Sequence, residues 1–153
     1  MGRPRKILVH APADLSDSDS RGRYINDLRK RVKLFDAKEA AALLGISQDR
    51  LYKLPIPRFE PSPRRSRWDG HSLADFLEKG MGTRASLAQY LAVVSGARPM
   101  TATTVADILG LHSDAVPFLG LETEDHSLRG RTIYQPGSLA RWLEQRQVLA
   151  EVP

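Results

Sequence analysis

The sequence predicts a mainly α-helical protein with small β-hairpins, organised as two similar units joined by a helix. Three observations lead to this prediction: two short capped helices between Leu34 and Leu54, a basic hairpin after them, and a repeat of the pattern about 65 residues later. Apolar residues at helical spacing, separated by turn-forming residues, are typical of such small helical domains.

The first two helices are predicted from their capping residues. Asp36 and Glu39 have the capping-box spacing, in which two side chains satisfy backbone donors at a helix start. Gly45 readily takes the left-handed conformation that ends a helix. Ser47 can then cap a second helix, whose Leu51 faces the first. The result is a helix-turn-helix with polar residues on the outer side of its second helix.

A basic hairpin is expected after these helices. The prolines at 55 and 57 end the second helix, because proline lacks the backbone donor and clashes with the preceding turn. Two short extended segments then flank a loop rich in proline and arginine, between Arg58 and Trp68. Asp69 is expected to cap a third helix that carries Leu73 and Leu77. Helix, turn, helix, hairpin and helix together describe a winged helix-turn-helix.

The residues from Leu34 to Lys79 resemble the MerR-like and phage-excisionase winged-helix family. The resemblance rests on the opening segment Phe35–Ser47, FDAKEAAALLGIS, and on Trp68 before the SLADFL helix at 72–77. It implies a protein that binds double-stranded DNA at directly repeated or bent sites. Such a protein would be a sequence-specific regulator or an excisionase-like recombination factor.

The same pattern recurs later in the chain. Ala37, Ala41, Leu44 and Gly45 recur as Ala102, Ala106, Leu109 and Gly110, and the segment 72–78 recurs at 138–144. The chain is therefore predicted to be mainly α with small β-hairpin wings, in tandem winged helix-turn-helix domains joined by a helix. The predicted parts are a flexible basic arm and linker at 1–20, a basic helix at 21–33, a first unit at 34–80, a connecting helix at 81–98, a second and degenerate unit at 99–147, and a tail at 148–153.

The second unit is expected to differ from the first. Pro117 stands where the first unit has Tyr52, so the matching helix is broken or about one turn long. Acidic residues follow it and would repel phosphate. The second unit is therefore expected to serve a structural or partner-binding role, with backbone contacts through Arg129 and Arg131. The apolar stripe of the connecting helix could be buried between the units or could form a dimer interface.

Charge is concentrated near the N-terminus. The 153 residues carry a formal charge of +5, and residues 1–33 hold nine Lys/Arg against four Asp/Glu. A basic balance suits an anionic partner. The segment Gly2-Arg3-Pro4-Arg5-Lys6 resembles the core of an AT-hook, which lies in the minor groove of A·T-rich DNA. A solvated tail without a specific partner is the alternative.

The candidate DNA contacts are divided by the type of group they reach. Gln48 and Arg50 are the candidates for base contacts, because Gln pairs with adenine and Arg with guanine through two hydrogen bonds. The others would bind phosphate or the minor groove and so set the register. The full set of predicted DNA-binding residues is Arg3, Arg5, Lys6, Lys38, Ser47, Gln48, Arg50, Tyr52, Lys53, Arg64, Arg65, Arg67, Arg129 and Arg131.

Other classes of protein are disfavoured by the sequence. There is no cysteine, the four histidines are scattered, and no phosphate-binding loop or nucleophile elbow stands out, so no enzyme activity, cofactor or metal is expected. A cytoplasmic, nucleoid-associated protein of a bacterium or phage is expected, without a membrane partner. Two alternatives are a small-terminase-like subunit for phage DNA packaging and an adaptor that binds protein. Self-association or a recombinase or packaging partner would accompany these roles.

Overall fold

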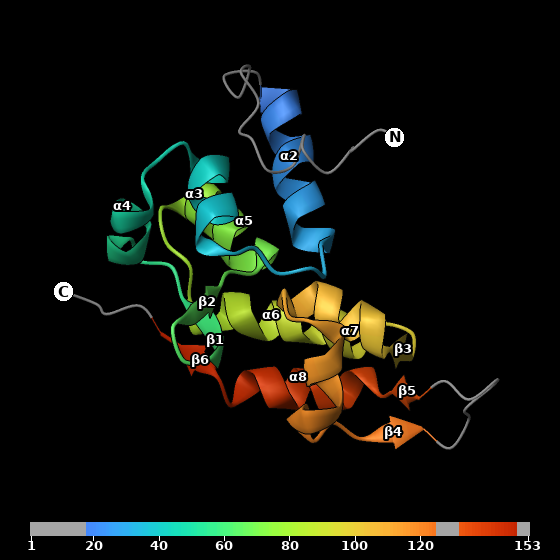
Figure 1. The fold of residues 1–153 in the computed structure, drawn as a ribbon. Coiled ribbons are helices and arrows are strands. Elements are labelled where there is room, and N and C mark those ends of the chain that lie inside the picture. Colours follow the sequence, from blue (N-terminus) through green and yellow to red (C-terminus); the bar gives the residue numbers. More distant parts are fainter. Residues whose placement is uncertain (1–17, 125–131, 150–153) are drawn as a thin grey trace, which may run out of the picture.

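The computed structural model describes residues 18–124 and 132–149, which form a mainly helical chain with two small antiparallel sheets (Figure 1). Its described elements are, in order, α2 (Ser18–Lys30), α3 (Ala37–Leu44), α4 (Gln48–Lys53), β1 (Arg58–Ser62), β2 (Arg65–Arg67), α5 (Gly70–Lys79), α6 (Arg84–Ser95), β3 (Met100–Thr101), α7 (Ala102–Leu109), η1 (Ser113–Leu119), β4 (Thr123–Glu124), β5 (Ile133–Tyr134), α8 (Pro136–Glu144) and β6 (Gln147–Val148).

The predicted caps of the first two helices are confirmed. Asp36 Oδ1 accepts a hydrogen bond from the Glu39 amide at 2.8 Å, and Glu39 Oε1 accepts one from the Asp36 amide at 3.0 Å. Gly45 ends α3 in the left-handed conformation, with φ of 71°. Ser47 Oγ accepts from the Arg50 amide at 3.2 Å and so caps α4. These local hydrogen bonds set the turn between α3 and α4.

The hairpin forms as predicted, but it belongs to a larger sheet. Strands β1 and β2 are antiparallel, with Phe59 opposite Arg67, and Arg64 turns the chain between them with φ of 68°. The other edge of β1 pairs with β6, where Arg58 lies opposite Val148. The prediction of a tail from residue 148 was therefore wrong for Val148, which lies in a sheet strand that joins the chain end to the first unit.

The internal repeat is visible in matching structural positions. Helix α7 begins and ends 65 residues after α3, and Gly110 ends it with φ of 69°, as Gly45 ends α3. The backbone bridge between Phe35 and Trp68 has a counterpart in the pairing of Met100 with Tyr134. The pattern of small and apolar residues therefore reflects a repeated arrangement of elements.

The connecting helix α6 lies in the interior. Its apolar stripe at Leu87, Tyr90, Leu91 and Val94 is buried with residues of α7 and α8, and Phe59 of the first hairpin joins the same cluster. Figure 1 shows α6 lying between the first unit and α8. The stripe is therefore buried between the units, which decides against its use as a dimer interface.

The basic helix α2 packs on the first unit, as expected, although it spans 18–30 instead of 21–33. Its Tyr24, Ile25 and Leu28 are buried in the core of that unit. Arg29 forms ion pairs with Asp75 at 2.7 Å and Glu78 at 3.2 Å. This arginine therefore serves an internal contact between α2 and α5.

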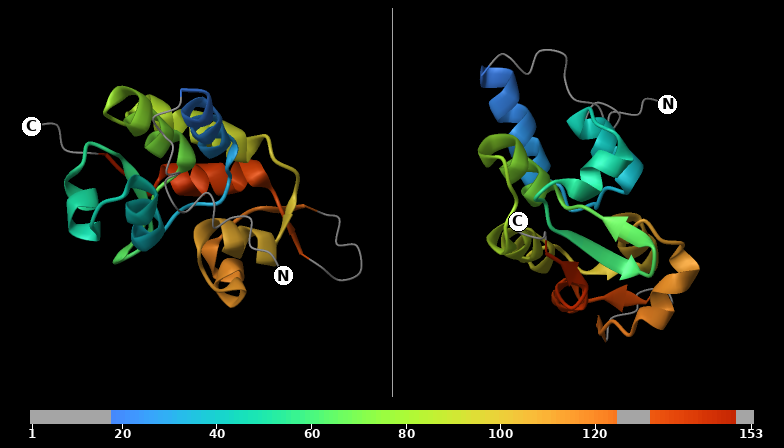
Figure 2. Two further views of the ribbon diagram at one scale, coloured as in Figure 1. Left: turned by 90° about the horizontal axis from the view of Figure 1, so that it is seen from above. Right: turned by 90° about the vertical axis from the view of Figure 1, so that its left-hand side faces the viewer.

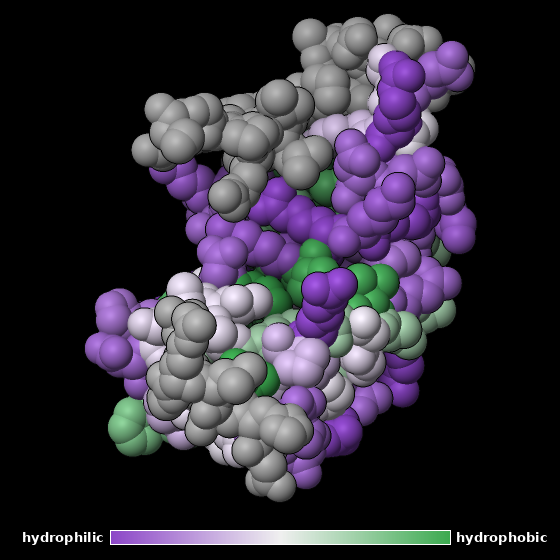
Figure 3. Space-filling view, turned by 90° about the vertical axis from the view of Figure 1, so that its right-hand side faces the viewer, coloured by the Kyte–Doolittle hydropathy of each residue, from purple (hydrophilic) through white to green (hydrophobic). Residues whose placement is uncertain are grey.

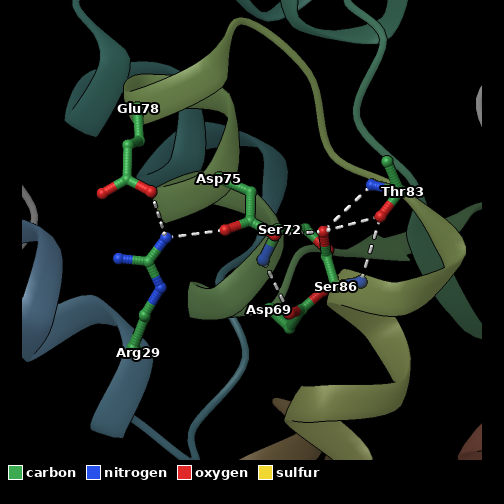
Figure 4. Close-up of polar contacts among 7 residues, drawn as sticks. All are labelled: Arg29, Asp69, Ser72, Asp75, Glu78, Thr83 and Ser86. Atoms are coloured by element: carbon green, nitrogen blue, oxygen red, sulfur yellow. Dashed lines mark hydrogen bonds and ion pairs between the residues drawn. The ribbon is translucent and has the colours of Figure 1, made fainter.

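A polar network continues from this ion pair to α6 (Figure 4). Ser86 Oγ donates to Asp75 Oδ2 at 2.5 Å, so Asp75 links α2 to α6. Burial disfavours the charged form of Asp75, but hydrogen bonds from Ser86 and Arg29 outweigh it and lower the carboxyl pKa. Asp69 is fully buried, which raises its pKa to about 7, and its Oδ2 accepts from the Ser72 amide at 2.9 Å. Asp75 therefore ties α5 to both α2 and α6, while Asp69 caps the start of α5.

The prediction that the second unit has a broken or short helix at the position that matches α4 is also confirmed. Ser113–Leu119 form a short 3₁₀ helix, η1, with Pro117 inside it. Strands β4 and β5 pair where the second hairpin was expected. The loop between them, with Arg129 and Arg131, lies outside the described residues.

Candidate nucleic-acid interface

The outer side of α4 is exposed, while its inner side holds the helix to the protein. Leu51 is 1% exposed and belongs to the core of the first unit. Gln48, Arg50 and Lys53 are exposed, and their side chains have no hydrogen bond or ion pair within the described residues. Figure 2, seen from two further directions, shows α4 at an edge of the fold. The polar groups of this helix are thus open to an external partner.

Tyr52 also lies on this helix, but other side chains contact its ring. Tyr52 as a residue is 45% exposed, and its ring meets the ring of Trp68 edge-on, with 5.3 Å between centroids. The guanidinium carbon of Arg58 lies 5.2 Å from the Tyr52 centroid. Sequence reasoning did not select Arg58. No motif could have indicated it, because the contact joins a strand to a helix.

The wing arginines divide into two groups. Arg64 and Arg65 are exposed and lie at the tip of the hairpin. Arg67 instead donates from Nε to the Leu109 carbonyl at 2.9 Å and from Nη2 to the Gly110 carbonyl at 3.0 Å. The prediction of Arg67 as a DNA contact is therefore corrected: its guanidinium is used inside the protein, at the C-terminal end of α7.

The remaining predicted residues lie in three places. Lys38 is exposed on α3. Ser47 is exposed too, although its hydroxyl accepts the α4 capping bond. Outside the described residues lie Arg3, Arg5, Lys6, Arg129 and Arg131. The structure therefore places the exposed residues of α4 beside the hairpin.

The second unit presents a different surface at the matching position. Helix η1 contains no lysine or arginine, and its Phe118 is 88% exposed. Asp114 in the first turn of this helix is exposed, and the exposed Glu122 follows the helix. On the face opposite α4, hydrophobic residues gather in the middle, between more hydrophilic regions (Figure 3). A polyanion is better matched by α4 than by η1, because η1 carries an aspartate and no basic residue.

Features of other kinds of site are few in the described part of the chain. No group of three or more His, Asp or Glu residues there could hold a metal ion. No helix among the described residues is both long and apolar enough to cross a bilayer. An open pocket of about 590 Å³ lies in the second unit, between Thr101–Thr104, Pro117 and Tyr134.

Comparisons with protein-family models, with curated proteins and with solved structures find no match for this chain. The resemblance at residues 34–79 therefore stays an expectation based on those residues.

Proposed function

We propose that this chain is a double-stranded DNA-binding protein built from tandem winged helix-turn-helix units, with α4 of the first unit entering the major groove. The observation that carries the proposal is the division of α4 into a buried side at Leu51 and an exposed side with Gln48, Arg50 and Lys53. In helix-turn-helix proteins the second helix lies in the major groove, and its outer side chains meet the base edges.

The exposed groups suit different parts of a duplex. Gln48 can form two hydrogen bonds with adenine, and Arg50 can form two with guanine. Lys53 and the hydroxyl of Ser47 suit phosphate, as do Arg64 and Arg65 on the hairpin. Arg67 is left out of this set because its guanidinium is already bound to backbone carbonyls.

The biological process that fits best is sequence-specific regulation or excisionase-like recombination. Support comes from the resemblance at residues 34–79. The basic N-terminal segment adds support, because arginines in a thin segment are attracted to a narrow minor groove.

Selection of bound duplexes from a random pool, followed by titration of the selected site and a shuffled site, tests the proposal. We expect affinity for the selected duplex to exceed that for the shuffled one at physiological salt, and log affinity to fall linearly with log salt. Failure to bind any duplex at low salt would contradict it.

A second candidate function is favoured by Phe118. A phenylalanine that is 88% exposed, on a short helix that carries Asp114 and no basic residue, suits a protein partner better than DNA. In this alternative the chain is an adaptor that binds its protein partner through η1 of the second unit. It predicts that Phe118→Ser removes partner binding and that α4 variants leave it unchanged.

A further inference from the structure

The ring of Tyr52 is held on two sides in the free protein. Trp68 contacts it edge-on, with the two planes at 73°, and Trp68 is itself 1% exposed and so fixed in the core. On another side, Arg58 lies over the ring at 5.2 Å, within the range of a cation–π contact. Tyr52 as a residue is nonetheless 45% exposed. Tyr52 is therefore both accessible and restrained.

Arg58 is restrained in its turn. It lies on β1, directly opposite Val148 of β6, so its backbone is held in the middle strand of the sheet. Its Nη2 lies 3.3 Å from Glu60 Oε2, and its side chain is only 21% exposed. The position of Arg58 therefore depends partly on the chain end, which reaches β1 from the second unit.

The second unit shows that the repeated arrangement does not need an aromatic ring at this place. The counterparts of Tyr52 and Trp68 are Pro117 and Tyr134, which lie 65 and 66 residues later in the chain. These two residues line the open pocket of about 590 Å³. The second unit therefore folds without an aromatic ring at this position. The need to fold does not by itself explain why the first unit has a tyrosine there.

We infer that Arg58 is a positioning residue: with Trp68 it holds the Tyr52 ring on the outer side of α4, where the ring contributes to discrimination between base pairs. This inference rests on the proposed function and changes the role of Tyr52 from a phosphate contact to a base contact. A restrained ring loses little conformational freedom on binding. The apolar edge of the ring suits the methyl group of thymine in the major groove.

The main test compares Arg58→Gln with Arg65→Gln, a matched loss of an arginine from the same hairpin. The measured quantity is the ratio of affinities for the selected and the shuffled duplex, as a function of salt. Arg58→Gln should lower this ratio by about two- to fivefold, the range of a partly exposed cation–π contact, and should leave the salt slope unchanged. Arg65→Gln should reduce the slope by about one phosphate contact and leave the ratio unchanged.

A double-mutant cycle identifies the route of the effect. Tyr52→Leu should lower the ratio at least as much as Arg58→Gln, and adding Arg58→Gln to it should lower the ratio no further. Arg58→Lys keeps a cation but loses the planar group, so its ratio should lie between those of the wild type and Arg58→Gln. Additive losses, or a reduced salt slope in Arg58→Gln, would overturn the inference, because Arg58 would then contact DNA directly.

A measurement without DNA separates the inference from the proposed function. NMR relaxation of the ring carbons measures the mobility of the Tyr52 ring in the free protein. Arg58→Gln should make the ring more mobile. Arg65→Gln should leave its mobility unchanged. An unchanged ring in Arg58→Gln would overturn the positioning role alone. If the wild type binds no duplex, the proposed function fails, and with it the role of Tyr52 in discrimination, whatever the mobility of the ring.

Discussion

The guanidinium of Arg67 donates from Nε to the carbonyl oxygen of Leu109 at 2.9 Å, and this contact joins the hairpin of the first unit to helix α7 of the second. The adjacent Gly110 makes the approach possible, because a Cβ atom there would lie 2.8 Å from Arg67 Nε. The last carbonyls of a helix carry partial negative charge, which an arginine balances. Arg67 therefore stabilises the arrangement of the two units.

Replacing Arg67 with alanine should lower the free energy of unfolding by about 1.5–3 kcal/mol. The variant loses hydrogen bonds from a charged donor, and the Leu109 and Gly110 carbonyls lose their hydrogen-bond partner. Urea denaturation followed by circular dichroism measures the change. Arg65→Ala is the matched control and should change stability by less than about 0.5 kcal/mol. Equal losses in the two variants would show that the contact with α7 adds no stability.

Alanine substitutions at two helical glycines should change the free energy of unfolding in opposite directions. A Cβ atom at Gly70 would lie 1.9 Å from the Leu28 carbonyl oxygen, so α2 and α5 would have to separate. Gly70→Ala should cost about 1–3 kcal/mol. Gly22 lies in α2 with no atom within 4 Å of the same position, and Gly22→Ala should add about 0.5–1 kcal/mol. Thermal unfolding of both variants tests the packing of α2 on α5.

Asp69 should make stability depend on pH. Burial raises its pKa to about 7, so the folded protein binds this proton more tightly than the unfolded chain. The contribution of Asp69 to the stability of the folded protein is therefore full below about pH 4 and is lost as the pH rises through about 7.

The variant Asp69→Asn keeps an oxygen at the helix cap and cannot ionise. Its free energy of unfolding should fall less than that of the wild type over this pH range. Burial lowers the pKa of His71, which works in the opposite direction, so the wild type and the variant must be compared at each pH. Parallel pH profiles would show that Asp69 does not titrate in this range.

Arg50→Ala should weaken binding to the selected duplex by about 1–3 kcal/mol and weaken binding to shuffled DNA less. Fluorescence anisotropy at fixed salt measures both. Arg98→Ala removes an exposed arginine away from α4 and is the control, with little effect on either duplex. An equal loss on both duplexes in Arg50→Ala would mean that Arg50 contacts phosphate only.

Deleting residues 1–6 removes Arg3, Arg5 and Lys6. The slope of log affinity against log salt should then fall by up to about three charges, at roughly 0.9 per phosphate neutralised. Replacing the three residues with glutamine in the full chain separates charge from length. An unchanged slope in both variants would show that the arm does not bind the duplex.

The helix ends were predictable because their causes are local. Asp36, Gly45, Ser47 and Asp69 act on backbone groups within a few residues, so the order of residue types was enough to place them. The repeat was predictable for a related reason. The same small, turn-forming and apolar residues recur in the same order, and the structure places them at matching positions.

Only the tertiary structure decided what depends on contacts between distant segments. Strand β6 has two residues and no distinctive pattern, so nothing in the sequence indicated its pairing with β1. Arg65 and Arg67 look alike in the sequence, yet one is exposed and the other binds carbonyls 42 and 43 residues away. Local chemistry determines where helices begin and end, whereas the partner of a long side chain depends on which surfaces the folded chain brings together.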